Sequence, residues 1–155
     1  MSAVHPLDRP VWNCLNGRQS SLTVATGDAV RIDPRYGPFA TARDQGEVAQ
    51  AALAALLRDD ADELWIVEAE PWPAPLGTQV VLHKELLQMV AEQPQAPLPG
   101  DAPALLLGDA DVPEMTALAL ATEPGPWGDW THRYGNFYGY RDAAGLQAMA
   151  GMRML

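Results

Sequence analysis

The sequence predicts an α+β fold: a mixed α/β arrangement with a mostly antiparallel sheet and flanking helices. Short apolar runs are paired around glycine-containing turns, which is typical of β-hairpins. Only two longer segments space their apolar residues as one face of an amphipathic helix does. Fourteen prolines and 13 glycines argue against long uninterrupted helices, while 48% apolar residues are enough for a core.

The first third contains a hairpin followed by a helix. Asp44 is the expected N-cap of that helix, and Glu47 is its expected capping-box partner. The expected elements, in order, are a helical turn at 13–19, strands at 22–25 and 29–32 joined by a turn at 26–28, a loop at 33–39 and a helix at 46–58. The apolar stripe expected on the helix consists of Val48, Ala52, Leu53, Leu56 and Leu57.

The middle of the chain is rich in proline. We expect a buried strand at 64–67, ended by three prolines, then a strand at 78–82 and a strand or irregular segment at 86–90. Residues 93–103 contain four prolines in eleven positions, which is typical of a semi-rigid linker. This linker predicts an α+β region at 1–92 and a second region at 104–155.

The last third reads as strand, helix, aromatic loop and hairpin. Asp111 is the expected N-cap, Pro113 suits the first turn of the helix, and Glu114 is the expected capping-box partner. The helix ends at the Pro/Gly-rich stretch that starts at Glu123. The expected strands are 104–107, 137–141 and 146–154, with Leu146, Ala148, Ala150, Met152 and Met154 on one face of the last.

Composition excludes several functions. The net charge of −10, with scattered arginines and a single lysine, excludes nucleic acid as the main ligand. One cysteine, Cys14, leaves no intramolecular disulfide. The N-terminus lacks a signal-peptide pattern, and the longest apolar run, 51–57, is far too short to cross a membrane. We therefore expect a cytoplasmic protein without a membrane partner.

Motifs for other chemistries are absent from the sequence. The three histidines have no partner at metal-ligand spacing, so we expect no metal site. Cys14 with a distant histidine could form a nucleophilic pair, but a small buried side chain is the simpler interpretation. Glu68 and Glu70 are expected on the same face of a strand. They could form a buried acid pair, or they could lie at an exposed strand end. No Gly-x-Gly triplet offers a phosphate cradle.

Aromatic residues gather between Trp127 and Tyr140. They suit either a core that holds a loop over a sheet or a pocket for a small polar or cationic ligand. The candidate substrate-binding residues are Glu123, Trp127, Thr131 and Tyr138.

Residues 104–153 resemble the start of a GNAT-type N-acetyltransferase of the FR47-like group. The similarity rests on the order of three stretches: Ala104 to Met115, Glu123 to Trp127, and Tyr134 to Arg153. These match the first strand, the first helix, the substrate-side loop and the following hairpin of that fold. The resemblance implies that residues 1–92 are a degenerate GNAT-like half. It also implies transfer of an acetyl group from acetyl-CoA to an amine of a small molecule or peptide.

The donor-binding part of that family has no counterpart in the sequence. The Gln/Arg-x-x-Gly-x-Gly/Ala loop would follow the third strand, where this chain ends, so we expect an incomplete GNAT-like fold without activity of its own. An exposed last strand would invite association, including a homodimer. A non-catalytic binding module is the alternative, and a divergent hydrolase using carboxylates is a third interpretation. The catalytic and cofactor-binding residues stay unassigned.

Overall fold

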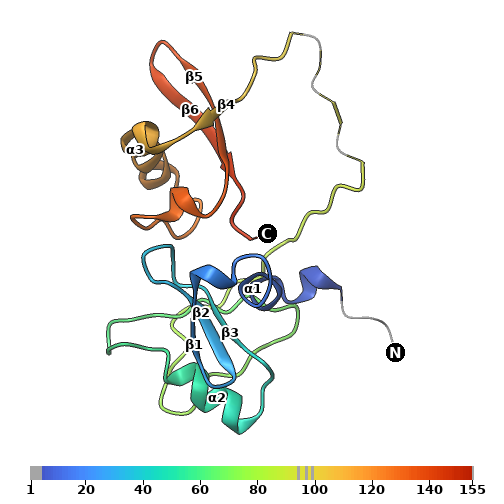
Figure 1. Ribbon diagram of the computed structural model, residues 1–155, viewed down its shortest axis with the longest axis vertical. Coiled ribbons are helices and arrows are strands. Elements are labelled where there is room, and N and C mark those ends of the chain that lie inside the picture. Colours follow the sequence, from blue (N-terminus) through green and yellow to red (C-terminus); the bar gives the residue numbers. More distant parts are fainter. Residues whose placement is uncertain (1–4, 94, 97, 99, 155) are drawn as a thin grey trace.

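The structure is a computed structural model that describes residues 5–93, 95, 96, 98 and 100–154. It contains two three-stranded antiparallel sheets, with strand orders β1-β2-β3 and β4-β5-β6. Figure 1 shows the two sheets one above the other, joined by a long extended segment. The predicted α+β fold class is confirmed. The predicted division into regions stays a prediction, with residues 94, 97 and 99 of the linker and residues 1–4 and 155 outside the described part.

The first unit contains a predicted hairpin and an unpredicted strand. Gly27 has φ 54°, a left-handed conformation that glycine adopts without strain. It lies in the turn that reverses the chain between the antiparallel strands β1 and β2. β3 adds a third strand that the sequence did not reveal, because it is only three residues long and two of them are alanines, which have low strand propensity. The elements are α1 (Pro10–Leu15), β1 (Thr23–Thr26), β2 (Ala29–Ile32), β3 (Ala40–Ala42) and α2 (Glu47–Ala54), with single 3₁₀ turns at Pro6–Asp8 and Ser20–Leu22.

α2 is shorter than predicted and begins differently. Gly46 is the N-cap, while Asp44 accepts a hydrogen bond from the Gly46 backbone N–H at 2.8 Å and so closes a turn before the helix. The predicted Asp44 cap is therefore wrong. Of the predicted apolar stripe, Leu53 and Leu56 are buried against β2 and β3, whereas Val48 is 72% exposed and Ala49 packs in its place.

The two strands predicted in the middle of the chain do not form. Trp65 makes a single parallel bridge to Phe39, so 64–67 is a bridge rather than a strand. Residues 78–90 have no regular structure, and the side chains of 79–90 are all exposed. Residues 78–82 have high strand propensity, but no strand among the described residues pairs with them.

The second unit follows the predicted order. The elements are β4 (Leu105–Leu107), α3 (Val112–Thr122), β5 (Phe137–Asp142) and β6 (Gly145–Gly151), with 3₁₀ turns at Asp109–Asp111 and Thr131–Arg133. Asp111 is the N-cap residue, but its carboxylate accepts from the Gly108 N–H and not from the helix. Glu114 binds Arg141 and the Leu146 N–H, so the predicted capping box is wrong.

A β-bulge changes the predicted faces of β6. Tyr140 pairs with Ala148 and Arg141 pairs with Leu146, which leaves Gln147 as an extra residue. Leu146 and Met149 therefore both pack into the core beneath α3, although strict alternation places them on opposite faces. The bulge cannot be recognised from a period-two pattern.

Gly151 gives a test of the packing in the second unit. A Cβ atom at this position would lie 2.3 Å from ring carbons of Phe137, which belongs to the core with Leu107 and Met115. Gly151→Val should displace that ring and lower the free energy of unfolding by about 1–3 kcal/mol in urea titrations. Gly108→Ala is the control, since a Cβ atom added at Gly108 would have no neighbouring atom within 4 Å. Equal stability of the two variants would refute this packing.

Candidate functional site

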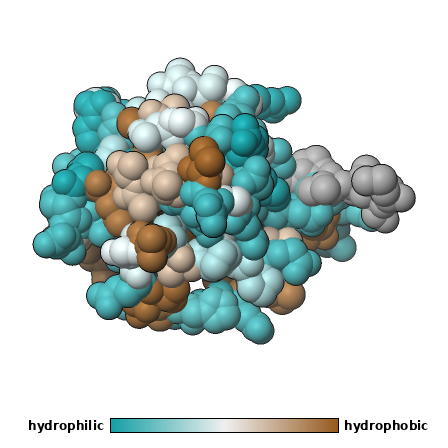
Figure 2. Space-filling model, turned by 90° about the horizontal axis from the view of Figure 1, so that it is seen from below, coloured by the Kyte–Doolittle hydropathy of each residue, from teal (hydrophilic) through white to brown (hydrophobic). Residues whose placement is uncertain are grey.

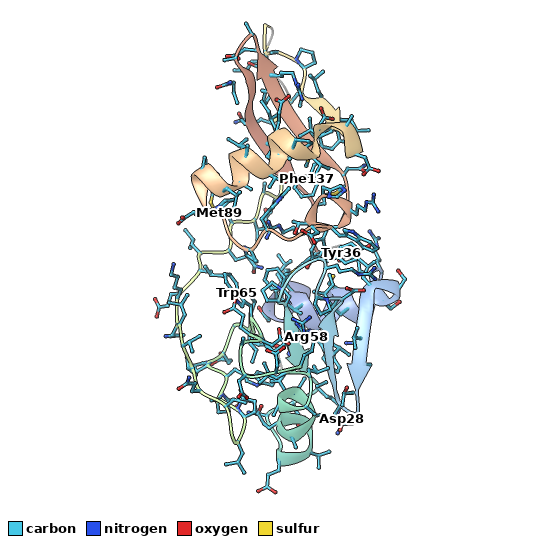
Figure 3. The ribbon with its side chains drawn as sticks, turned by 90° about the vertical axis from the view of Figure 1, so that its left-hand side faces the viewer. Asp28, Tyr36, Arg58, Trp65, Met89 and Phe137 are labelled. Atoms are coloured by element: carbon cyan, nitrogen blue, oxygen red, sulfur yellow. The ribbon has the colours of Figure 1, made fainter. Side chains whose placement is uncertain are left out.

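An open cavity of about 590 Å³ lies where the two units meet. Its walls come from the loop around Gly37, the segment 58–65 that follows α2, and the loop 126–128 that precedes β5. Figure 3 places Tyr36 at the junction of the two units, with Arg58 and Trp65 in the unit below it. The volume falls in the range of small-molecule sites.

Two tryptophans give the cavity its apolar walls. Trp65 packs edge-on against Phe39, with ring centroids 6.2 Å apart, and Trp127 packs edge-on against Phe137 at 5.7 Å. The Trp127 indole N–H donates to the Thr116 hydroxyl of α3 at 3.1 Å. Both rings are thus fixed from behind by the sheets, which leaves rigid aromatic surface for a ligand.

A buried ion cluster forms the floor of the cavity. Arg31 and Asp62 have side chains only 3% and 5% exposed, and their closest nitrogen–oxygen distance is 2.7 Å. Arg58 binds the other side of the same carboxylate, also at 2.7 Å. The hydrogen bonds from Arg58, joined by those from Arg31, hold the pKa of Asp62 well below its ordinary value. Asp62 is therefore an ionised structural group, not a proton donor near neutral pH.

The loop that carries Trp127 is fixed to the first unit. Thr131 is fully buried, donates to the Tyr36 carbonyl at 2.9 Å and accepts from the Gly128 N–H at 2.7 Å. Trp130 packs edge-on against Tyr36, and the Arg35 guanidinium lies 3.7 Å from its ring centroid. These contacts set the position of the cavity wall.

Two hydrogen-bond donors close to the junction lack acceptors. The Tyr134 hydroxyl is buried with no hydrogen-bond partner among the described residues, and burial raises its pKa. Arg153 is half-buried, and no hydrogen bond or ion pair joins its side chain to the described residues; burial lowers its pKa. The Arg153 guanidinium lies beside Gly125, next to the cavity wall. Of the two, the Arg153 guanidinium is partly exposed and suits an acceptor group on a ligand, whereas the Tyr134 hydroxyl is enclosed in the first core.

The structure separates the four predicted substrate-binding residues. Trp127 lines the cavity, and Thr131 lies behind it as a structural residue. Glu123 is exposed at the C-terminus of α3 with φ 45°, and Tyr138 is 43% exposed on β5. Neither of the last two lines the cavity. Their roles in substrate binding stay predictions.

Other candidates from the sequence are engaged in structural contacts. Cys14 is buried in the first core and contacts Gln19. Glu68 binds Arg9 and the Thr41 hydroxyl with a side chain 5% exposed, while Glu70 is exposed. Within the described residues, no group of three His, Cys, Asp or Glu side chains is arranged to hold a metal ion.

Sequence reasoning missed Arg31 and Trp65 as cavity residues. Arg31 lies within the apolar run Ala29–Ile32, and a charged residue in a buried strand requires a partner. A charged residue in this strand predicts a buried ion pair. It does not predict that the partner is Asp62, because Arg31 and Asp62 are distant in sequence and meet only in the folded chain.

The fold and the cavity define an α+β protein with an aromatic-walled site between two sheets. A similar solved structure is the crystal structure of a "Putative Acetyltransferase from the GNAT family" from Novosphingobium aromaticivorans, with 56% sequence identity and a TM-score of 0.86. The match covers 97% of this chain and 66% of that chain. No family model and no curated protein matches the sequence.

This similarity supports placing the chain in the GNAT family, as the sequence predicted. The chain spans just under two thirds of the similar protein. No helix in the described part of the chain is long and apolar enough to cross a membrane.

Proposed function

We propose that this chain forms the acceptor-binding part of an acetyl-CoA-dependent N-acetyltransferase. The observation that carries the proposal is the 56% identity to a GNAT-family structure over nearly the whole chain. The cavity beside Trp127 supports it, because this loop is the substrate-side loop in the resemblance stated above. The finer FR47-like assignment and a cytoplasmic location are part of the same proposal.

The N-terminus of α3 does not provide a site for the acetyl-CoA pyrophosphate. A phosphate cradle needs free backbone N–H groups at a helix N-terminus. At α3 the Gly108 N–H is taken by Asp111, and Asp109 and Glu114 add negative charge there. The N-terminus of α3 is therefore unsuited to the pyrophosphate of acetyl-CoA.

The cavity, together with Arg153 beside it, suits an amine that also carries a hydrogen-bond acceptor or an acidic group. Trp65 and Trp127 would contact the body of the acceptor or its ammonium group. Arg153 would attract a carboxylate or carbonyl, since its charge is half-buried beside Gly125 and has no partner in the described part. The acceptor class is then a small-molecule or peptide amine.

Steady-state kinetics of acetyl transfer, with the protein expressed from its complete reading frame, test the acceptor site. Trp127→Ala should raise KM for the amine about tenfold, because a rigid aromatic contact is lost, and should leave KM for acetyl-CoA unchanged. Trp12→Ala is the control, since Trp12 is not among the residues that line the cavity. An unchanged amine KM for Trp127→Ala would remove the cavity from the acceptor site.

A non-catalytic binding module is the second candidate. It is favoured by the lack of a Gly-x-Gly triplet in the sequence and by the acidic N-terminus of α3. Such a module would bind a ligand in the cavity but give no acetylated product and no response to acetyl-CoA in a thermal-shift assay. The predicted homodimer through the C-terminal strand belongs equally to both candidates.

A further inference from the structure

The side chain of Thr131 connects two walls of the cavity that belong to different units. Its hydroxyl donates to the Tyr36 carbonyl oxygen at 2.9 Å and accepts from the Gly128 N–H at 2.7 Å. Tyr36 precedes Gly37 in the wall formed by the first unit, and Gly128 itself lines the wall formed by the second. Thr131 is fully buried behind this point and is not among the residues that line the cavity. It therefore ties the two walls together without contacting their contents.

The backbones of the two units approach each other closely at the same point. The Trp130 N–H donates to the Arg35 carbonyl oxygen at 3.0 Å. A Cβ atom at Gly128 would lie 3.0 Å from that oxygen, so a larger residue there would push the loop away from the first unit. The Thr131 N–H closes the loop by donating to the Gly128 carbonyl oxygen at 3.1 Å. The hydroxyl of Thr131 thus completes a junction that the loop backbone already makes in part.

The first unit also holds the loop on both sides of Thr131. On one side the Arg35 guanidinium lies 3.7 Å from the centroid of the Trp130 ring. On the other side the buried Gln19 amide donates to the Tyr134 carbonyl oxygen at 3.0 Å, across 115 positions of sequence. Figure 2 shows the far end of the first unit, where hydrophobic side chains are interspersed with hydrophilic ones as on an ordinary solvent-facing surface. The contacts of the first unit with the loop are therefore concentrated at residues 130–134.

Trp127 depends on this junction for its place in the cavity. It is the neighbour of Gly128, whose N–H binds the Thr131 hydroxyl. The ring of Trp127 is oriented by contacts within the second unit, whereas Trp65 belongs to the wall of the first unit. The separation of the two tryptophan walls is thus set where the units are joined. A displacement of about 1 Å at a positioning group can lower a rate on the order of 100-fold.

We propose that Thr131 is a positioning residue of the acceptor site: it holds Trp127 at a fixed distance from the wall of the first unit and so determines how tightly the site binds an amine. This role rests on the proposed function, because that function assigns the cavity to the acceptor. Thr131 uses its hydroxyl as donor and as acceptor at once. Serine keeps both capacities, and valine keeps the shape but neither capacity.

Steady-state kinetics with the protein expressed from its complete reading frame test this role, with amino acids, polyamines and peptides as the amines. Thr131→Val should raise KM for the amine about tenfold and leave KM for acetyl-CoA unchanged. Thr131→Ser should stay within about twofold of the parent in both constants. Thr41→Val is the matched control, because Thr41 is equally buried and donates to Glu68 at 2.6 Å but does not line the cavity. It should lower stability without changing either KM.

Hydrogen exchange of the Trp130 amide shows independently whether the junction opens. The reference is the Ile32 amide of the first core, which donates to the Phe39 carbonyl oxygen at 3.0 Å. Relative to this reference, the Trp130 amide should exchange at least about tenfold faster in Thr131→Val than in the parent. Gly128→Ala perturbs the same junction without changing the hydroxyl and should give the same two results. The test therefore does not depend on the folding of one variant.

Two outcomes would overturn the role of Thr131 alone. One is faster Trp130 exchange in Thr131→Val and Gly128→Ala with an unchanged KM for the amine, which would make the junction purely structural. The other is an equal rise of that KM in Thr131→Val and Thr41→Val, which would make the effect one of general stability. A parent protein that acetylates no amine of the panel would instead refute the proposed function, and the role of Thr131 with it.

Discussion

Asp62→Ala should lower the free energy of unfolding by about 3–5 kcal/mol, because it leaves the buried guanidinium of Arg31 without its counter-ion. The loss also removes the hydrogen bonds that Arg58 makes to the same carboxylate through its backbone and side chain. Chemical denaturation measures the change. Asp60→Ala, at an exposed position in the same segment, should stay within about 0.5 kcal/mol of the parent.

A double variant shows whether the unpaired charge causes the loss. Arg31→Met in the Asp62→Ala background removes the buried charge and should restore most of the stability. A stability of Asp62→Ala equal to that of Asp60→Ala would show that the pair is not buried in solution.

The same pair predicts how stability depends on pH. The arginines lower the pKa of Asp62 in the folded protein below its unfolded value of about 3.9. Ionised Asp62 therefore contributes its full stabilisation above its pKa in the unfolded chain. This stabilisation is lost as the pH falls toward the pKa of Asp62 in the folded protein. Between about pH 4 and pH 2 the parent should lose more stability than Asp62→Asn.

Glu68→Ala should lower the free energy of unfolding by about 2–3 kcal/mol, the second largest effect. Glu68 accepts from Arg9 at 2.8 Å and from the Thr41 hydroxyl at 2.6 Å, and its side chain is 5% exposed. The Arg9 guanidinium also lies between the rings of Trp12 and Trp72, at 5.1 and 5.4 Å from their centroids. The expected cost is smaller than for Asp62 because Arg9 is 23% exposed.

Tryptophan fluorescence and denaturation together measure this second effect. The emission of the two rings around Arg9 should shift when the guanidinium loses its position. Glu70→Ala, two residues further along, is exposed and should be neutral within about 0.5 kcal/mol. A neutral Glu68→Ala would mean that the buried contacts of Glu68 with Arg9 and Thr41 do not stabilise the fold.

Local patterns predicted the elements that depend on local chemistry. The hairpin at β1–β2 follows from Gly27, and the β5–β6 hairpin follows from alternation on both sides of a turn. β3 was missed because its three residues form a strand only through pairing with β2. The expected strand at 78–82 has high intrinsic propensity but no partner strand.

The candidate site was predictable only in part, because most of its residues come together only through contacts between distant segments. The aromatic loop identified Trp127, which lines the cavity. Arg31, Asp62 and Trp65 come from segments that are distant in sequence and meet only in the folded chain. The family resemblance came from the order of elements in residues 104–153, and the 56% identity to a GNAT-family structure supports it.

The sharpest test of the proposed function is mass spectrometry of amines incubated with acetyl-CoA and the protein expressed from its complete reading frame. We predict an amine product that gains one acetyl group, with release of free CoA, and reduced turnover for Trp127→Ala at low amine concentration. No acetylated amine from a panel of amino acids, polyamines and peptides, together with no binding of acetyl-CoA, would contradict the proposed function.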